Sequence, residues 1–203
     1  NRNFSLIWFA GLISIMGNWI IMVALPYHIY NVTGSALATS AWLMAYILPG
    51  VLFSSVAGVF VDRWDRKKTM IFTNLLQMLV ILMLVLVKSP EYIWIVYVVG
   101  FLESTLSQFF SPAESALLPQ LVDEEYLMQA NSMNALNDNL GRVIGPVIGG
   151  ILLGVWGLNS IIIADALSYL LSSILIGFIV VPGVIEKVKD SPAVESAREK
   201  FSA

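Results

Sequence analysis

The sequence predicts an all-α, polytopic membrane protein built as a bundle of six transmembrane helices. Of its 203 residues, 58% are hydrophobic and only 12% are charged, whereas soluble proteins carry about 45–50% apolar and about 25% charged residues. Residues 3–61 contain no Asp, Glu, Lys or Arg. This composition argues against a water-soluble domain, and also against a disordered chain, because disordered segments are poor in apolar residues.

The positions of the polar residues divide the chain into spans. A helix needs about 20 apolar residues to cross the hydrocarbon core, so the uncharged stretch at 3–61 holds two helices, separated by the polar, glycine-containing turn at 31–35. The same reasoning along the chain predicts spans at residues 4–30, 36–61, 69–87, 92–110, 126–156 and 161–181. We expect the six-helix bundle to occupy residues 1–182 and a cytoplasmic linker to begin at 183–203.

Connections of different character join these spans. A charged link covers residues 62–68, and a short turn covers 88–91. A longer polar connection is expected to hold Pro112, Glu114 and the acidic cluster at 123–125. The last turn is expected at 157–160, where a glycine precedes polar residues.

Basic residues set the expected orientation. Cytoplasmic loops of membrane proteins are enriched in Lys and Arg. Nine of the 11 basic residues fall on one side if the chain start, the 62–68 link and the tail share that side: Arg2, Arg63, Arg66, Lys67, Lys68, Lys187, Lys189, Arg198 and Lys200. Both ends of the chain are therefore expected in the cytoplasm, with the protein in the plasma membrane.

Composition also excludes several kinds of site. The chain has no cysteine and a single histidine, His28, which argues against disulfides, thiolate chemistry and histidine metal clusters. No G-x-x-x-x-G-K-[ST] phosphate loop occurs, and no basic patch interleaved with aromatic residues points to nucleic acid. We expect no cofactor, no bound metal, no nucleic-acid partner and no enzymatic activity.

The link between the second and third spans carries a motif of glycine, acid and bases. Its members are Gly58, Asp62, Arg63, Arg66 and Lys67. Basic residues after a span are ordinary topology anchors, but anchoring requires neither the aspartate nor a glycine one helical turn before it. Topology anchoring alone therefore does not explain the whole motif.

The fifth span carries a stripe of glycines. Gly141, Gly145 and Gly149 recur every four residues, with Pro146 and Gly150 beside them. Small residues at this spacing form a bare face that lets another helix approach closely, and a proline inside a helix removes a backbone donor and can bend it.

These two motifs resemble the major facilitator superfamily. The first resembles its G-x-x-x-D-[RK]-x-G-[RK]-[RK] signature, with Asp65 in place of the second glycine; the second resembles the G-x-x-x-G-P-x-x-G-G motif of its exporters. Further segments are similar to the macrolide-efflux-like branch, which includes siderophore exporters: Thr33-Gly34-Ser35-Ala36-Leu37, Ser111-Pro112-Ala113, Ala116-Leu117-Leu118-Pro119 and Asp165-Ala166-Leu167-Ser168.

The resemblance implies a fold and a mechanism. The fold would be the N-terminal half of a transporter, made of two inverted three-helix repeats, with the solute held between this half and a C-terminal half of the same protein. Asp62 would face a helix end in that other half, as a latch formed when the inner side is shut, and such a contact biases the equilibrium between the two access states.

Four ionisable side chains lie inside the expected spans: Glu103, Asp138, Arg142 and Asp165. Intramembrane charges are costly and usually line a bundle interior or a water-filled cavity. Asp138 and Arg142, four residues apart with the acid first, suit an ion pair. Glu103, alone in its span, is the first candidate for a proton carrier, because an apolar medium favours the neutral carboxyl; a purely structural hydrogen bond is the alternative. Asp165 is expected near the outer membrane surface.

Together these observations predict a secondary exporter of small amphipathic or hydrophobic solutes such as drugs. Its energy source would be a proton gradient, its mechanism alternating access, and its surroundings the lipid bilayer. An exporter of siderophores or lysophospholipids remains an alternative, as does a non-transporting membrane scaffold. A membrane-embedded enzyme would need a catalytic cluster, and the scattered carboxylates do not form one.

Overall fold

Long runs of apolar residues fold into six helices because a helix satisfies every backbone hydrogen bond within its own segment. The computed structural model describes residues 1–181, and within them there is no strand. The helices are α1 (Arg2–Thr33), α2 (Ala36–Val61), α3 (Arg66–Leu82), α4 (Ile93–Leu117), α5 (Leu127–Trp156) and α6 (Leu158–Gly177). All six are long and apolar enough to cross a membrane, counting for α3 the 3₁₀ turn that follows it. The predicted all-α fold with six spans is confirmed.

The helix limits differ from the expected ones at several ends. The prediction for α2 is confirmed at both ends, and α3 begins three residues early and continues into a 3₁₀ turn at Met83–Leu86. The larger error concerns α4, which extends to Leu117 and so places Pro112 and Glu114 inside the helix rather than in a polar connection. Proline is tolerated in membrane helices because neighbouring groups satisfy the freed carbonyl. The linker expected at 183–203 lies outside the described residues.

Two glycines make the short turns at one end of the bundle. Gly34 has φ +63° and ends α1, its N–H donating to Tyr30 O; Gly157 has φ +74° and separates α5 from α6 as a single residue, where a turn at 157–160 was expected. Both values lie in the left-handed region that glycine enters without steric cost.

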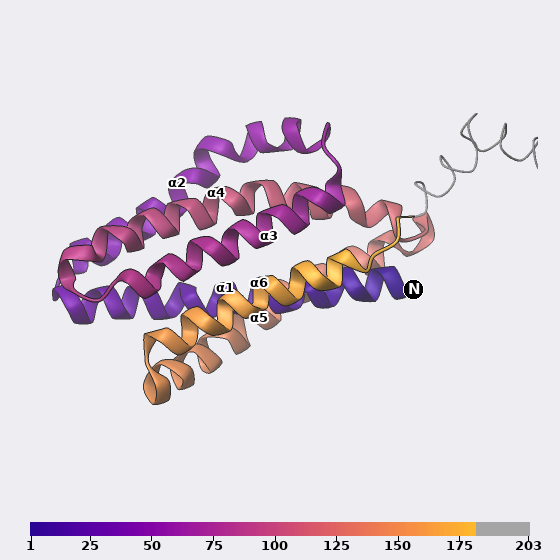
Figure 1. The fold of residues 1–203 in the computed structure, drawn as a ribbon. Coiled ribbons are helices and arrows are strands. Elements are labelled where there is room, and N and C mark those ends of the chain that lie inside the picture. Colours follow the sequence, from indigo (N-terminus) through magenta and orange to yellow (C-terminus); the bar gives the residue numbers. More distant parts are fainter. Residues whose placement is uncertain (182–203) are drawn as a thin grey trace, which may run out of the picture.

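The helices pack in a pattern that repeats. The helix α1 packs on α5 and α6, the helix α4 packs on α2 and α3, and α3 also packs on α6. Exchanging α1 with α4, α2 with α5 and α3 with α6 maps these main contacts onto themselves. Because α1 and α4 start at opposite ends of the bundle (Figure 1), the two sets of three helices are inverted. The expected architecture of two inverted three-helix repeats therefore agrees with the packing.

The helix α2 bends along its length. Pro49 lies in the middle of α2, and the helix changes direction beyond it (Figure 1), although Phe53 still packs on Phe101 of α4 and Val61 is fully buried. Sharp bends in helices usually occur at proline. Large apolar side chains on this part of α2 are exposed, Val51 by 75%, which suits contact with lipid or with other helices.

The interior is layered along the bundle axis. One apolar cluster includes Ile29, Trp42 and Val99 towards the end that holds Gly34, and a second includes Ile7, Met70 and Leu117 towards the N-terminal end. Buried polar side chains fall between them in sequence on four helices: Ser14, Thr73, Asn74, Gln77, Glu103, Ser104, Asp165, Ser168, Ser172 and Ser173. A polar layer therefore crosses the middle of the bundle.

Candidate functional site

Glu103 of α4 is the centre of the polar layer. Its side chain is 7% exposed, and its Oε2 accepts hydrogen bonds from Tyr169 Oη of α6 at 2.8 Å and from Gln77 Nε2 of α3 at 3.2 Å. Gln77 Nε2 also lies 3.1 Å from Ser107 Oγ, one turn along α4. Glu103 shares α4 with Glu114, so it is not alone in its span as expected, and its hydrogen bonds join three helices.

Asp165 of α6 is buried inside the bundle, about two turns from the start of the helix, and its expected height near the outer membrane surface stays a prediction. It is 1% exposed, and its Oδ1 accepts a hydrogen bond from Ser168 Oγ at 3.2 Å. Gly17 of α1 makes the room: a methyl group there would collide with Asp165 Oδ1 and Ser168 Oγ. The neighbouring helix, rather than the height along α6, decides the burial of this carboxylate.

Glu103 and Asp165 line the same small internal cavity. Asn18, Trp42 and Tyr46 also line it, and Tyr46 Oη donates a hydrogen bond to Asn18 Oδ1 at 3.2 Å. Two polar atoms at this cavity, Glu103 Oε1 and Trp42 Nε1, are buried without a hydrogen-bond partner among residues 1–181. Two carboxylates in one buried cavity disfavour the state in which both are charged, so the pair suits proton binding and release.

A larger polar cavity of about 450 Å³ adjoins this cluster. It lies between α1, α4 and α5, and Gln77 and Tyr169, the two hydrogen-bond donors to Glu103, form part of its wall. Its other polar lining residues are Ser14, Asn18, Ser107, Ser111, Glu114, Ser115, Asn131, Asn134, Asn137 and Asp138. Gln77 and Tyr169 therefore contact both the Glu103 carboxylate and this cavity.

Glu114 is a site residue that the sequence reasoning missed. It belongs to the polar face of α4 formed by Glu103, Ser107, Ser111 and Glu114, whose spacing of four, four and three residues is helical. Glu114 Oε1 lies next to Gly11 of α1, 3.1 Å from where a methyl group would stand. The periodicity would have identified Glu114 if Pro112 had not been taken as the end of the helix.

Asp138 and Arg142 do not form the expected ion pair. Both side chains are exposed on α5, and in the described part of the chain no ion pair joins them. The Arg142 guanidinium instead lies over the ring of Trp19, with 5.3 Å between Cζ and the ring centroid, a favourable cation–π distance. Arg142 is therefore not a buried cation, and Asp138 faces the polar cavity.

The glycine stripe of α5 packs against α1. A methyl group at Gly145 would come within 2.5 Å of Trp19 Cβ, and one at Gly149 within 3.2 Å of Ile20 O. A methyl group at Gly141 would likewise clash with Ile15 and Trp19. Gly150 differs, because no described atom lies within 4 Å of a methyl group at that position. Pro146 lies within α5 without ending it.

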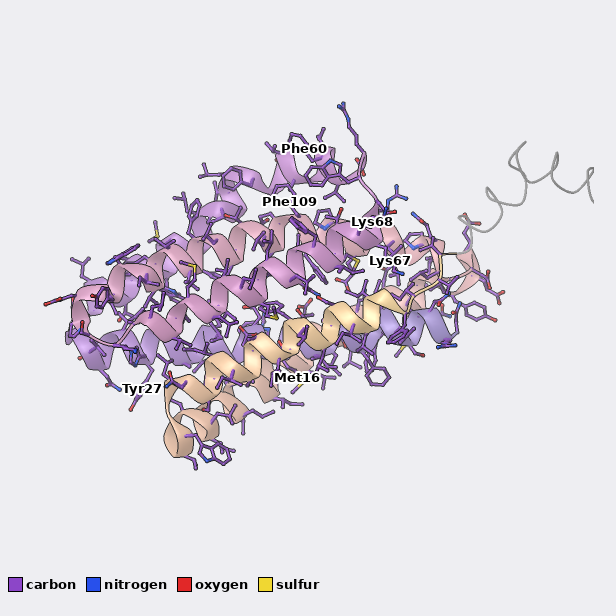
Figure 2. The ribbon with its side chains drawn as sticks, in the orientation of Figure 1. Met16, Tyr27, Phe60, Lys67, Lys68 and Phe109 are labelled. Atoms are coloured by element: carbon purple, nitrogen blue, oxygen red, sulfur yellow. The ribbon has the colours of Figure 1, made fainter. Side chains whose placement is uncertain are left out.

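The charged link between α2 and α3 divides into two parts. Asp65 caps α3, its Oδ1 accepting from Lys68 N at 2.9 Å, so the aspartate that replaces a glycine of the signature has a local role. Lys67 Nζ donates to Gly177 O and Ile179 O at the end of α6, both at 2.8 Å (Figure 2). Both residues stabilise contacts within this bundle, and the gating role expected of Lys67 stays a prediction.

The remaining residues of the link leave their side chains outside the bundle. Asp62 and Arg63 are exposed, and neither side chain makes a hydrogen bond within residues 1–181. Arg66 is half-buried, and its Nε has no partner in the same part of the chain. A methyl group at Gly58 would meet no described atom within 4 Å. A packing partner for Gly58 and for these side chains would therefore have to come from residues outside 1–181.

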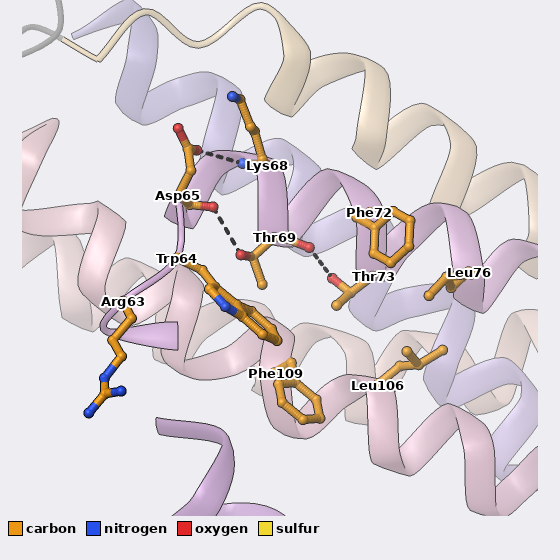
Figure 3. A pocket seen from close by; sticks show the side chains of 10 residues that line it. All are labelled: Arg63, Trp64, Asp65, Lys68, Thr69, Phe72, Thr73, Leu76, Leu106 and Phe109. Carbon is orange, nitrogen blue, oxygen red and sulfur yellow. Dashed lines mark hydrogen bonds between the residues drawn. The ribbon is translucent and has the colours of Figure 1, made fainter. Parts of the chain in front are cut away.

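Beside the link lies a hollow of about 670 Å³ between α3 and α4 (Figure 3). Trp64 and Phe109 stack across it, with 6.1 Å between ring centroids. Phe72, Leu76 and Leu106 continue this apolar wall. The stacking fixes the link against α4, and so relates the position of Asp62 to that of the helix that carries Glu103.

The sequence is similar to those of known membrane transport proteins. The sequence model of the Major Facilitator Superfamily matches residues 7–203. Macrolide efflux protein A of Streptococcus pyogenes is 30% identical over 188 residues, which are 92% of this chain and 46% of that protein. Macrolide efflux protein A of Enterococcus faecalis is 32% identical over 77% of this chain and 49% of its own length.

An enterobactin exporter of Shigella boydii is also similar, being 31% identical over 76% of this chain and 38% of its own length. The chain thus spans about half the length of the curated relatives it matches, or less.

Proposed function

Since the chain belongs to the Major Facilitator Superfamily, a family of multi-pass membrane transporters, we propose that it forms the N-terminal half of an exporter of small amphipathic or hydrophobic solutes. In this proposal a C-terminal half of the same protein completes the solute pathway. Protons entering down their gradient drive the solute out by alternating access. The relatives named as efflux proteins and exporters support the direction of transport.

The observation that carries the proposal is the connection from Glu103 to the polar cavity. Tyr169 and Gln77 donate to the Glu103 carboxylate and also line that cavity. A change in the charge of Glu103 would alter the hydrogen bonds of both side chains, and with them the shape and polarity of the cavity wall. Proton binding and solute binding would thereby become coupled, as linkage between two sites requires.

The glycine stripe and the link supply the moving surfaces in this proposal. Close packing of Gly141, Gly145 and Gly149 on α1 joins these two helices into one unit. The exposed carboxylate of Asp62 is free to meet a helix N-terminus of the other half, a contact worth about 0.3–1 kcal/mol when exposed. The distribution of basic residues supports a plasma-membrane orientation with both chain ends in the cytoplasm.

The test uses the full-length transporter that contains this chain, reconstituted in vesicles with a radiolabelled macrolide as probe. An imposed proton gradient is expected to drive accumulation of the probe in the vesicles, and Glu103→Gln to abolish the dependence on the gradient while leaving the protein folded. Glu91→Gln is the matched control, because Glu91 is exposed at the far end of the bundle. Accumulation by Glu103→Gln that depends on the gradient as in the wild type would contradict the proposal.

A further inference from the structure

We propose that the cavity between α1, α4 and α5 binds an organic ammonium group, so that the preferred solute is an amphipathic amine. The inference rests on the proposed transport function and specifies the chemistry of its substrate. It separates amines from the anionic solutes, such as carboxylate- or catecholate-bearing iron chelators, that a related exporter could carry.

The charge of the cavity is the first observation. Glu114 of α4 and Asp138 of α5 line it, and none of its lining residues is Lys, Arg or His. Within the part of the chain that the structure describes, neither carboxylate accepts a hydrogen bond or forms an ion pair. A cation is the ligand that compensates two such charges, while an anion would meet like charges.

Unpaired acceptors are the second observation. Asn137 is 1% exposed, and its Nδ2 donates to Trp8 O at 3.0 Å, which leaves Oδ1 as a buried acceptor without a partner among residues 1–181. Asn134 Oδ1 is buried and unpaired in the same way. Both residues line the cavity. A ligand with N–H donors would satisfy them, because buried polar groups normally have hydrogen-bond partners.

The surrounding charges leave the cavity acidic. Apart from the basic residues at the starts of α1 and α3, which do not line the cavity, the charged residues of the helices around it are Glu103, Glu114, Asp138, Arg142 and Asp165. Glu103 already accepts from Tyr169 and Gln77, and Asp165 from Ser168. Arg142, the one cation in this set, lies over Trp19 instead of neutralising Asp138.

Size and apolar lining define the rest of the solute. A cavity of about 450 Å³ falls within the range of about 300–1,000 Å³ that holds drug-sized ligands. Phe110, Tyr169 and Ile15 offer apolar and aromatic surface in the same cavity, and aromatic faces attract ammonium groups within about 6 Å. An ammonium group near Glu114 and Asp138 with an apolar body against these residues would use both features.

The experiment measures equilibrium binding to the purified full-length transporter, without a proton gradient. Three naphthalene probes of similar size differ in charge: N,N-dimethyl-1-naphthylmethylamine is cationic, N,N-dimethyl-1-naphthamide neutral and 1-naphthoate anionic. We expect the ammonium probe to bind most tightly, and Glu114→Gln with Asp138→Asn to weaken its binding about tenfold or more, since the two substitutions remove both carboxylates that would pair with the ammonium group. Binding of the amide should not change.

Controls keep the result unambiguous. Glu124→Gln removes an exposed carboxylate outside the cavity and should not alter the affinity for any probe. Asp138→Asn alone changes an exposed side chain, so it provides a folded variant if the double substitution destabilises the protein; it should still weaken the ammonium probe selectively. Tighter binding of 1-naphthoate, or unchanged binding of the ammonium probe in Asp138→Asn and the double variant, would overturn the inference.

The two proposals can fail separately. Selective ammonium binding without proton-driven transport would contradict the transport function and leave the site standing. Proton-driven transport without any preference for the ammonium probe would contradict the site alone.

Discussion

The hydroxyl of Tyr169 on α6 donates to Glu103 Oε2 on α4 across 2.8 Å. Both side chains are buried, and no other tyrosine donates to this carboxylate among the described residues. The bond joins two helices of the same three-helix repeat that make little direct contact with each other. Between them lies α3, which packs on both and whose Gln77 donates to the same carboxylate. Removing the hydroxyl therefore tests how far the polar layer holds the bundle together.

Tyr169→Phe should destabilise the protein by about 1–3 kcal/mol, because it leaves a buried acceptor with one donor fewer. The measurement is thermal unfolding of the purified transporter in detergent. Tyr27→Phe is the control, because Tyr27 is 59% exposed on α1 (Figure 2). Equal melting temperatures for the two variants would show that the Tyr169 hydroxyl does not contribute to stability.

Gly145→Ala and Gly150→Ala should have opposite effects although they lie in the same helix. A methyl group at Gly145 would clash with Trp19 of α1, whereas at Gly150 it would meet no described atom. Overpacking of this kind costs about 1–3 kcal/mol, while alanine otherwise favours a helix over glycine by about 1 kcal/mol. The melting temperature and the rate of export should both fall for Gly145→Ala, and neither should fall for Gly150→Ala. A loss of the same size in Gly150→Ala would contradict the packing described.

Lys67→Met should loosen the end of α6. Lys67 Nζ donates to Gly177 O and Ile179 O, and a cation at a helix C-terminus contributes about 0.3–1 kcal/mol. We expect faster hydrogen exchange of the backbone amides at residues 174–179. In Lys68→Met, whose exposed side chain makes no such contact within residues 1–181, exchange should stay at the wild-type rate. Unchanged exchange in Lys67→Met would exclude this role.

Asp62→Asn should lower the rate of export more than the affinity for solute, without changing stability. Its side chain makes no hydrogen bond in the described part of the chain, so the bundle does not depend on it, whereas the proposed latch does. Asp65→Asn is the matched control, because asparagine is as good an N-cap as aspartate. Equal export rates in the two variants would contradict the latch and leave the link with only a role in setting membrane orientation.

Much of the fold can be predicted from the sequence because each signal is local. The uncharged run at 3–61 and the Gly34 turn predict α1 and α2, and the four-residue spacing of Gly141, Gly145 and Gly149 predicts a packed face. The end of α4 could not be predicted this way, since Pro112 reads as a helix end in water but is accommodated in the bundle.

The candidate site depends on contacts between helices, which one sequence does not reveal. Glu103 could be found as an intramembrane carboxylate, but its bond to Tyr169 joins residues 66 positions apart. The expected height of Asp165 along α6 does not indicate its burial, which only Gly17 of α1 explains. Arg142 is placed by Trp19 of another helix, so the local spacing that suits an ion pair with Asp138 was misleading.

If Glu103 carries the proton that drives export, the movement of protons across the membrane tests this role most directly. Vesicles holding the full-length transporter and an internal pH-sensitive dye would report protons moving as a macrolide is carried the opposite way. We expect solute-dependent proton movement in the wild type and in Glu91→Gln, and none in Glu103→Gln. Solute-dependent proton movement at the wild-type rate in Glu103→Gln would contradict this role of Glu103.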